Sequence, residues 1–92
     1  MSVLVTLSAP ILEDITKSTD RVELSGVRSF QDVLNKMEEM FPGFIALMYN
    51  DKGRLNAIID VYVNGESVFP EERQAKLKDG DTVSITMLYE GG

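Results

Sequence analysis

Cysteine and histidine are both absent from the 92 residues of this chain. Without cysteine there is no disulfide framework, no thiolate metal site and no thiol nucleophile. Without histidine the usual general base near neutral pH is missing, and a metal site could be built only from carboxylates and carbonyls. The sequence therefore predicts no catalytic residue and no metal site, and it argues against an enzyme that works alone.

Basic residues are also few, with nine Lys and Arg against fifteen Asp and Glu and a net charge of −6. A phosphate-binding surface needs clustered cations, and here they are scattered, so we expect no nucleic-acid partner and instead a basic protein partner. No apolar run approaches about 18 residues, and the N-terminus lacks the blocks of a signal peptide. We therefore expect no membrane association and a cytoplasmic protein.

The first half of the chain predicts two strands and one long helix, within one domain covering residues 1–92 that is 43% hydrophobic. The strands are residues 2–8 and 21–24, separated by a short helical turn or loop near Pro10 and a polar turn. Ser29 is a candidate N-cap, and Pro42 and Gly43 end the helix. The predicted apolar stripe of this helix comprises Phe30, Val33, Leu34, Met37, Met40 and Phe41.

The second half predicts a helical turn and three further strands. The turn begins at Phe44, and the strands are residues 58–63, a short return strand 67–69 after the tight turn Asn64-Gly65, and residues 82–88. The charged residues 71–76 are expected at the surface. A helix crossing one face of a mixed sheet gives an α+β fold, with the last strand beside the first.

The chain closes in two glycines, Gly91 and Gly92. Chance alone gives such a pair in roughly 0.5% of sequences at average glycine content. Since the preceding residues are predicted to lie in the sheet, we expect the last few to form a short flexible arm. Such an arm can enter a narrow channel in another protein, and its only reactive group is the carboxylate of Gly92.

Five segments follow one another in a characteristic order: residues 40–43 (MFPG), 51–55 (DKGRL), 61–66 (VYVNGE), 77–83 (LKDGDTV) and the final Gly-Gly. In this order, over essentially the whole chain, they resemble the ThiS/MoaD family of ubiquitin-like sulfur carriers. The resemblance implies a β-grasp fold, with a mixed sheet of about four to five strands and one main helix across one face. Tyr89 and Glu90 depart from the small or apolar residues that often precede the glycines in that family.

The resemblance also implies a function for Gly92. An activating enzyme of the ubiquitin-activating type would adenylate its carboxylate, and sulfur would then replace one oxygen to give a thiocarboxylate that is delivered to a biosynthetic enzyme. The connection Gly53-Arg54-Leu55 looks most like the molybdopterin-synthase small subunit and the cysteine-pathway carrier, so a molybdopterin-type product is favoured. No cofactor would be bound permanently, because ATP and Mg²⁺ would be used by the activating partner.

Several side chains near the tail have both a functional and a structural interpretation. Gly91 and Glu90 would thread into the partner, while Tyr89, Leu88 and Phe69 are candidates for an apolar contact patch, to which Tyr62 and Met87 could also belong. The sequence Asp79-Gly80-Asp81 is a turn rather than a calcium loop. Glu71 and Glu72 are interpreted as solvated surface acids.

Two alternatives remain open at the level of sequence. A protein modifier joined to lysines through Gly92 would begin from the same adenylate. A non-covalent β-grasp binding module would make the terminal glycines incidental.

Overall fold

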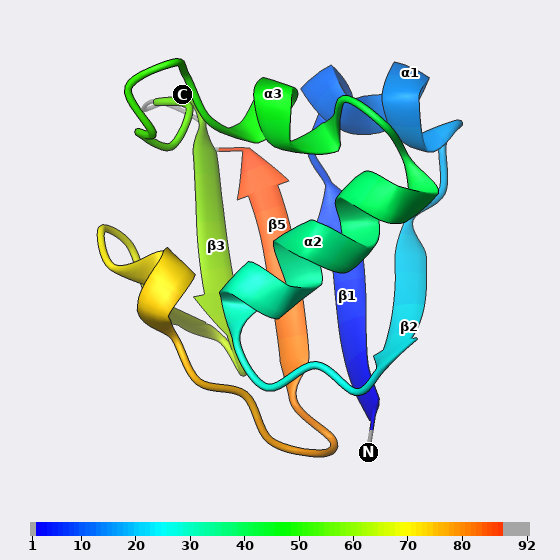
Figure 1. Cartoon of the computed structure of the whole chain (residues 1–92), viewed down its shortest axis with the longest axis vertical. Coiled ribbons are helices and arrows are strands. Elements are labelled where there is room, and N and C mark those ends of the chain that lie inside the picture. Colours follow the sequence, from blue (N-terminus) through cyan, green and yellow to red (C-terminus); the bar gives the residue numbers. More distant parts are fainter. Residues whose placement is uncertain (1, 88–92) are drawn as a thin grey trace.

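Five strands form one sheet in the spatial order β2-β1-β5-β3-β4, with helices on one face (Figure 1). The structure is a computed structural model, and it describes residues 2–87. The elements are β1 (Ser2–Ser8), η1 (Pro10–Leu12), α1 (Glu13–Thr16), β2 (Arg21–Ser25), α2 (Phe30–Met40), α3 (Phe44–Met48), β3 (Ile59–Val63), β4 (Glu66–Ser67), η2 (Glu72–Gln74) and β5 (Thr82–Met87).

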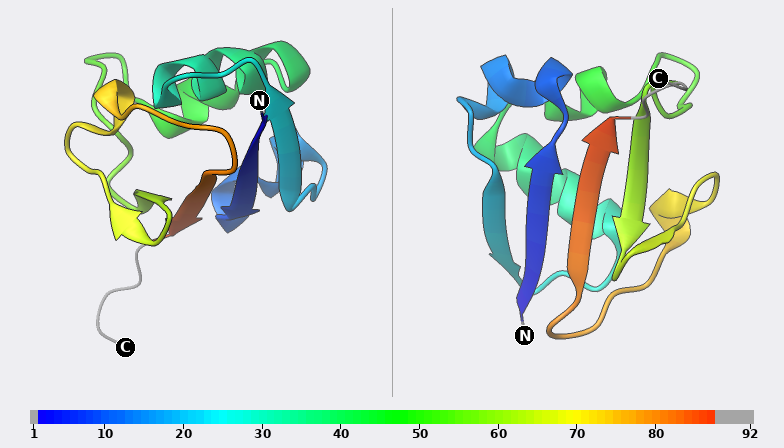
Figure 2. Two further views of the ribbon diagram at one scale, coloured as in Figure 1. Left: turned by 90° about the horizontal axis from the view of Figure 1, so that it is seen from below. Right: turned by 180° about the vertical axis from the view of Figure 1, so that it is seen from behind.

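The sheet is mixed, and β5 lies at its centre. Strand β1 is antiparallel to β2 and parallel to β5, with Val5 opposite both Val22 and Val83. On its other side β5 is antiparallel to β3, with Val61 opposite Ile85. Viewed from behind, the opposite face of the sheet is not covered by helices (Figure 2). The predicted α+β arrangement, with the last strand beside the first, is therefore confirmed.

Helix α2 buries its predicted stripe against the sheet, except at its C-terminal end. The Ser29 side chain accepts a hydrogen bond from the Asp32 N–H at 3.2 Å, so the predicted N-cap is confirmed. Met40 is 49% exposed, so the buried part of the predicted stripe ends before it. At 3.6 residues per turn Met40 lies about 80° around the axis from Phe30, at the margin of the stripe. Phe41 lies beyond the helix and is partly buried; the fully buried members are Phe30, Val33, Leu34 and Met37.

Gly43 connects α2 to α3 in a conformation that only glycine adopts easily. Its φ is +99°, and an added Cβ would lie 2.7 Å from Cδ1 of Ile15. The carboxylate of Glu38 accepts hydrogen bonds from the N–H groups of Gly43 and Ile45 at 2.8 and 2.9 Å. These contacts fix the start of α3, which forms the helical turn predicted after Pro42-Gly43.

Two predictions for the second half of the chain are wrong. The return strand is β4, Glu66–Ser67, and Phe69 lies outside it. Val68 N still donates to Val61 O at 3.1 Å, but the chain then turns toward η2 and leaves the sheet edge. In η2, Glu72 is 3% exposed although it was predicted at the surface. Its burial results from a tertiary contact with Tyr49 that no local pattern encodes.

Within the described residues, no helix is long and apolar enough to cross a bilayer. The same residues contain no cluster of three or more acidic side chains placed to hold a metal ion.

Candidate functional site

Strand β5 fixes the point from which the predicted reactive tail leaves the domain. Thr86 pairs with Ser8 of β1 and with Asp60 of β3, and Met87 pairs with Ile59 of β3, so β5 is held on both sides up to Thr86 and by β3 at its last residue. The predicted site residues Gly92, Gly91, Glu90, Tyr89 and Leu88 lie outside the described residues. The structure thus places the root of the tail between two neighbouring strands.

The turn that follows β3 and the turn that precedes β5 are brought together. Asn64 Nδ2 donates to Asp81 Oδ1 at 2.9 Å, and Asn64 Oδ1 accepts from Thr82 N at 2.9 Å. Asp81 Oδ2 also accepts from Lys78 N at 2.8 Å. The side-chain hydrogen bond from Asn64, followed by the backbone one from Lys78, lowers the pKa of Asp81. Asp81 therefore closes a turn, in agreement with the interpretation of Asp79-Gly80-Asp81 as a turn, and it fixes the start of β5.

The outer face of the sheet is largely polar around β5. Thr6 Oγ1 donates to Ser84 Oγ at 3.0 Å, and Thr82 and Thr86 lie on the same face of β5 as Ser84. Tyr62, opposite Ser84, also lies on this face, and a hydrogen bond to Asp60 raises its pKa. This part of the sheet offers hydroxyl groups rather than an apolar surface.

The described members of the candidate apolar patch are not brought to one face. Met87 lies two residues after the buried Ile85, so its side chain points to the same face of the sheet and packs against the core. The side chain of Tyr62 points to the outer face. Phe69 is 56% exposed, the most exposed of the large apolar side chains in the described part of the chain. Phe69 is therefore exposed, without Tyr62 or Met87 beside it, and its role as a partner contact stays a prediction.

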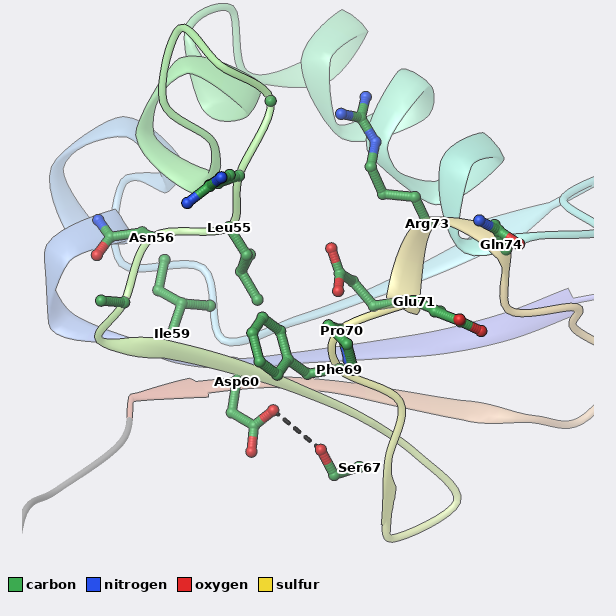
Figure 3. Close-up of a pocket in the computed structure, with 14 residues that line it drawn as sticks. Leu55, Asn56, Ile59, Asp60, Ser67, Phe69, Pro70, Glu71, Arg73 and Gln74 are labelled. Carbon is green, nitrogen blue, oxygen red and sulfur yellow. Dashed lines mark hydrogen bonds between the residues drawn. The ribbon is translucent and has the colours of Figure 1, made fainter.

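Phe69 lines a groove of about 600 Å³ between two segments of the chain. One wall is the loop 53–57, and the other is the segment 67–74, which includes η2 (Figure 3). The start of β3, with Ile59 and Asp60, also lines it. This groove was not predicted, because its two walls are separated in the sequence and meet only through the fold.

A buried polar network lies behind the groove and was also missed. Tyr49 donates its hydroxyl to Glu72 Oε2 at 2.7 Å, and both residues are at most 5% exposed. The guanidinium of Arg73 lies 4.5 Å from the centre of the Tyr49 ring, and Arg73 Nε donates to Gln31 Oε1 at 2.8 Å. Burial, and then the bond to Glu72, strongly raises the pKa of Tyr49.

The remaining oxygen of Glu72 has no partner within residues 2–87. Its Oε1 is buried and receives no hydrogen bond there. The interpretation of Glu72 as a solvated acid is therefore wrong, while Glu71 is exposed as predicted.

Comparison with known families gives one match over most of the chain. The model of the ThiS family matches residues 11–92. No curated protein sequence matches the chain.

Solved structures match along nearly the whole length. A chain of the Amycolatopsis orientalis BexX/CysO complex is 32% identical with a TM-score of 0.79, and 98% of this chain and 99% of that chain are covered. Mycobacterium tuberculosis CysO is 27% identical with a TM-score of 0.80, and the coverage is 95% and 99%. The small archaeal modifier protein 1 from Methanosarcina acetivorans is 26% identical with a TM-score of 0.72, and the coverage is 99% and 96%.

Proposed function

The chain belongs to the ThiS family of ubiquitin-like sulfur carriers, and from this membership we propose that it carries sulfur as a thiocarboxylate on Gly92. The observation that carries the proposal is the family match, which extends from residue 11 through the final Gly-Gly. The geometry supports it, because β5 is held between β1 and β3 up to Thr86 and pairs with β3 at Met87, the last described residue before the tail.

The proposed chemistry has two steps, and both need a partner. A carboxylate is a poor electrophile because its charge repels nucleophiles. One oxygen of Gly92 would therefore attack the α-phosphorus of ATP and release pyrophosphate, on an activating enzyme that supplies Mg²⁺ and stabilises the developing charge. A sulfide-level donor would then attack the acyl carbon, and AMP would leave with the original oxygen. The carrier contributes the acyl group and a fixed tail root.

Within the described residues, no side chain is placed to perform these steps. The buried acid Glu72 is hydrogen-bonded to Tyr49, and Asp81 closes a turn. We therefore propose that the protein is a carrier, whose partners are an activating enzyme of the ubiquitin-activating type and a sulfur-accepting biosynthetic enzyme. A molybdopterin-type product stays a prediction from the connection around Arg54.

The proposal is tested by intact mass spectrometry after incubation with a cognate activating enzyme, ATP and a sulfide source. We expect a mass gain equal to one oxygen-to-sulfur exchange, localised to the C-terminal peptide. A variant lacking Gly92 is the control and should show no gain. An unchanged mass of the full chain with several activating enzymes, each active on its own carrier, would contradict the proposal.

A second candidate function is conjugation to other proteins. One similar structure is named a small archaeal modifier protein, at 26% identity. In this case Gly92 would form an amide with a lysine of another protein, and the leaving group would again be AMP or a thiol of the activating enzyme. High-mass conjugates in cells would favour the modifier, whereas free thiocarboxylate would favour the carrier. A non-covalent binding module would keep its activity when Gly92 is deleted.

A further inference from the structure

The groove between residues 53–57 and 67–74 runs along the start of β3, whose residues Ile59 and Asp60 line it and are buried. Asn64 N donates to Thr82 O, so in the alternating antiparallel pattern Asp60 and Tyr62 direct their backbone groups toward β5. Ile59 and Val61 therefore direct theirs toward the other edge. There β4 pairs with Tyr62 and Val63, and Val68 N donates to Val61 O at 3.1 Å, so of the residues of β3 only Ile59 and Asp60 lie beyond the segment that follows β4.

Local contacts satisfy part of this edge. Ile59 N donates to Asn56 O at 2.9 Å, and Val61 N donates to Asp60 Oδ1 at 2.8 Å. Asp60 Oδ1 also accepts from Ser67 Oγ at 3.2 Å. With Ile59 2% exposed and Val61 fully buried, this part of β3 forms the floor of the groove and does not present a free backbone edge.

Two large apolar side chains face the groove: Phe69, which is exposed, and Leu55, which is partly buried. Leu55 and Phe69 lie on opposite walls and point toward one another in Figure 3, with Ile59 to the left of them. A ring that is 56% exposed retains much of its apolar surface in water, and burying it would stabilise a complex. An apolar side chain placed between Leu55 and Phe69 would cover this surface.

Charge favours a basic residue next to that apolar side chain. On the wall formed by residues 67–74, Glu71 is exposed, and Glu72 lies buried with one oxygen that no described residue bonds. Arg73 on the same wall is already held by Gln31 and the ring of Tyr49. The net charge of −6 also favours the approach of a basic segment. Arg54, on the opposite wall, would orient the basic residue toward Glu71.

The groove also lies next to the root of the tail. Ile59 lines the groove and pairs directly with Met87, the last described residue of β5. A protein that holds the tail can therefore reach the groove with a neighbouring segment.

We propose that this groove binds an extended segment of the protein that takes up the tail, with a large apolar residue between Leu55 and Phe69 and a basic residue beside Glu71. The segment lies along the groove, over the buried start of β3, and contacts the exposed Phe69 and Glu71. The identity of the partner rests on the proposed function, but the binding surface does not.

The test is an NMR titration of the full chain with the capped peptide acetyl-Thr-Val-Leu-Lys-Thr-Val-amide. We expect amide shift changes confined to residues 54–60 and 67–73. The same peptide with Glu in place of Lys should bind about fivefold more weakly, because it meets Glu71. Equal binding of both peptides, or shifts on the outer face of the sheet, would overturn the proposal.

Variants separate the two parts of the interaction. Phe69→Ala should weaken binding about tenfold, as expected for an aromatic anchor. Glu71→Lys should weaken it about fivefold, and Arg54→Glu should strengthen it, because each changes the charge beside the peptide lysine. Glu23→Lys makes the same charge change on the opposite edge strand and should leave the affinity within about twofold. If Glu71→Lys and Glu23→Lys weaken binding equally, only the net charge matters and the assigned site is wrong.

Other occupants give different results. Groove shifts that grow with protein concentration, in the absence of peptide, would assign the groove to a second copy of the chain. Groove shifts caused by deleting residues 88–92 would assign it to the chain's own tail. Either result overturns the proposal. A chain without Gly92 should bind the peptide normally, so failure of the thiocarboxylate chemistry and failure of this site are distinguishable.

Discussion

Replacing Tyr49 with phenylalanine should destabilise the protein, because it removes the one hydrogen bond that the described residues make to the buried Glu72 carboxylate. The bond is 2.7 Å long, and the other oxygen of Glu72 receives none from those residues. Hydrogen bonds to charged groups contribute about 1.5–3 kcal/mol, so we expect a loss of about 2 kcal/mol in the free energy of unfolding. The phenyl ring keeps the stacking surface for Arg73.

The measurement is urea unfolding followed by circular dichroism, with thermal unfolding as a second observable. For a domain of this size, a loss of 2 kcal/mol lowers Tm by about 8–16 °C. Tyr62→Phe is the matched control, since the Tyr62 hydroxyl bonds to Asp60 on the outer face of the sheet rather than within the core. Its effect should stay within about 0.5 kcal/mol.

The result that would refute this reasoning is a small effect of Tyr49→Phe. A change below about 0.5 kcal/mol would mean that the Glu72 carboxylate is satisfied without Tyr49. In a further variant, Tyr49→Phe combined with Glu72→Leu, no carboxylate remains buried without a donor. This double variant should be more stable than Tyr49→Phe alone, because removing both partners avoids that cost.

Met37→Ala should cost about 2–5 kcal/mol in urea unfolding because Met37 is fully buried, whereas Met40→Ala, at 49% exposure, should cost less than about 0.5 kcal/mol. Equal losses would contradict the assigned burial of the helix. Ser29→Ala should lower the free energy of unfolding by about 0.5–2 kcal/mol, since it removes the N-cap acceptor. Ser29→Thr keeps a hydroxyl at this position and should retain most of that stability. The lowered pKa of Asp81 stabilises the folded protein above the unfolded pKa of about 3.9, and this contribution is lost as the pH falls through the folded value. Asp81→Asn should therefore be less stable at pH 7 and lose less on acidification; parallel pH profiles of the two proteins would show that Asp81 has no such role.

The sequence was sufficient for elements whose signals are local. Alternation of Val3, Val5 and Leu7 predicted β1, and Ser29 marked the start of α2, because strand faces and helix caps depend on residues only a few positions apart. The sequence also predicted the turn at Asn64-Gly65. Both residues have positive φ values, and Asn and Gly are the residue types that adopt such values most readily.

Local signals failed where a residue's environment comes from distant segments. Phe69 was predicted in a strand and lies outside it, because the chain turns away from β3 after Val68. Met40 lies at the margin of a stripe whose width depends on where the sheet ends. Neither position differs in residue type from those predicted correctly.

The sequence by itself was enough to predict the fold class and the family, because these depend on periodicity and on the order of short motifs, and the chemistry proposed at Gly92 follows from the family resemblance. Only the tertiary structure decided that Glu72 is buried under Tyr49 and that residues 53–57 and 67–74 form a groove beside β3. The physical reason is that burial and grooves are properties of segments that meet in space, and residues separated by 23 positions, as Tyr49 and Glu72 are, carry no common local pattern.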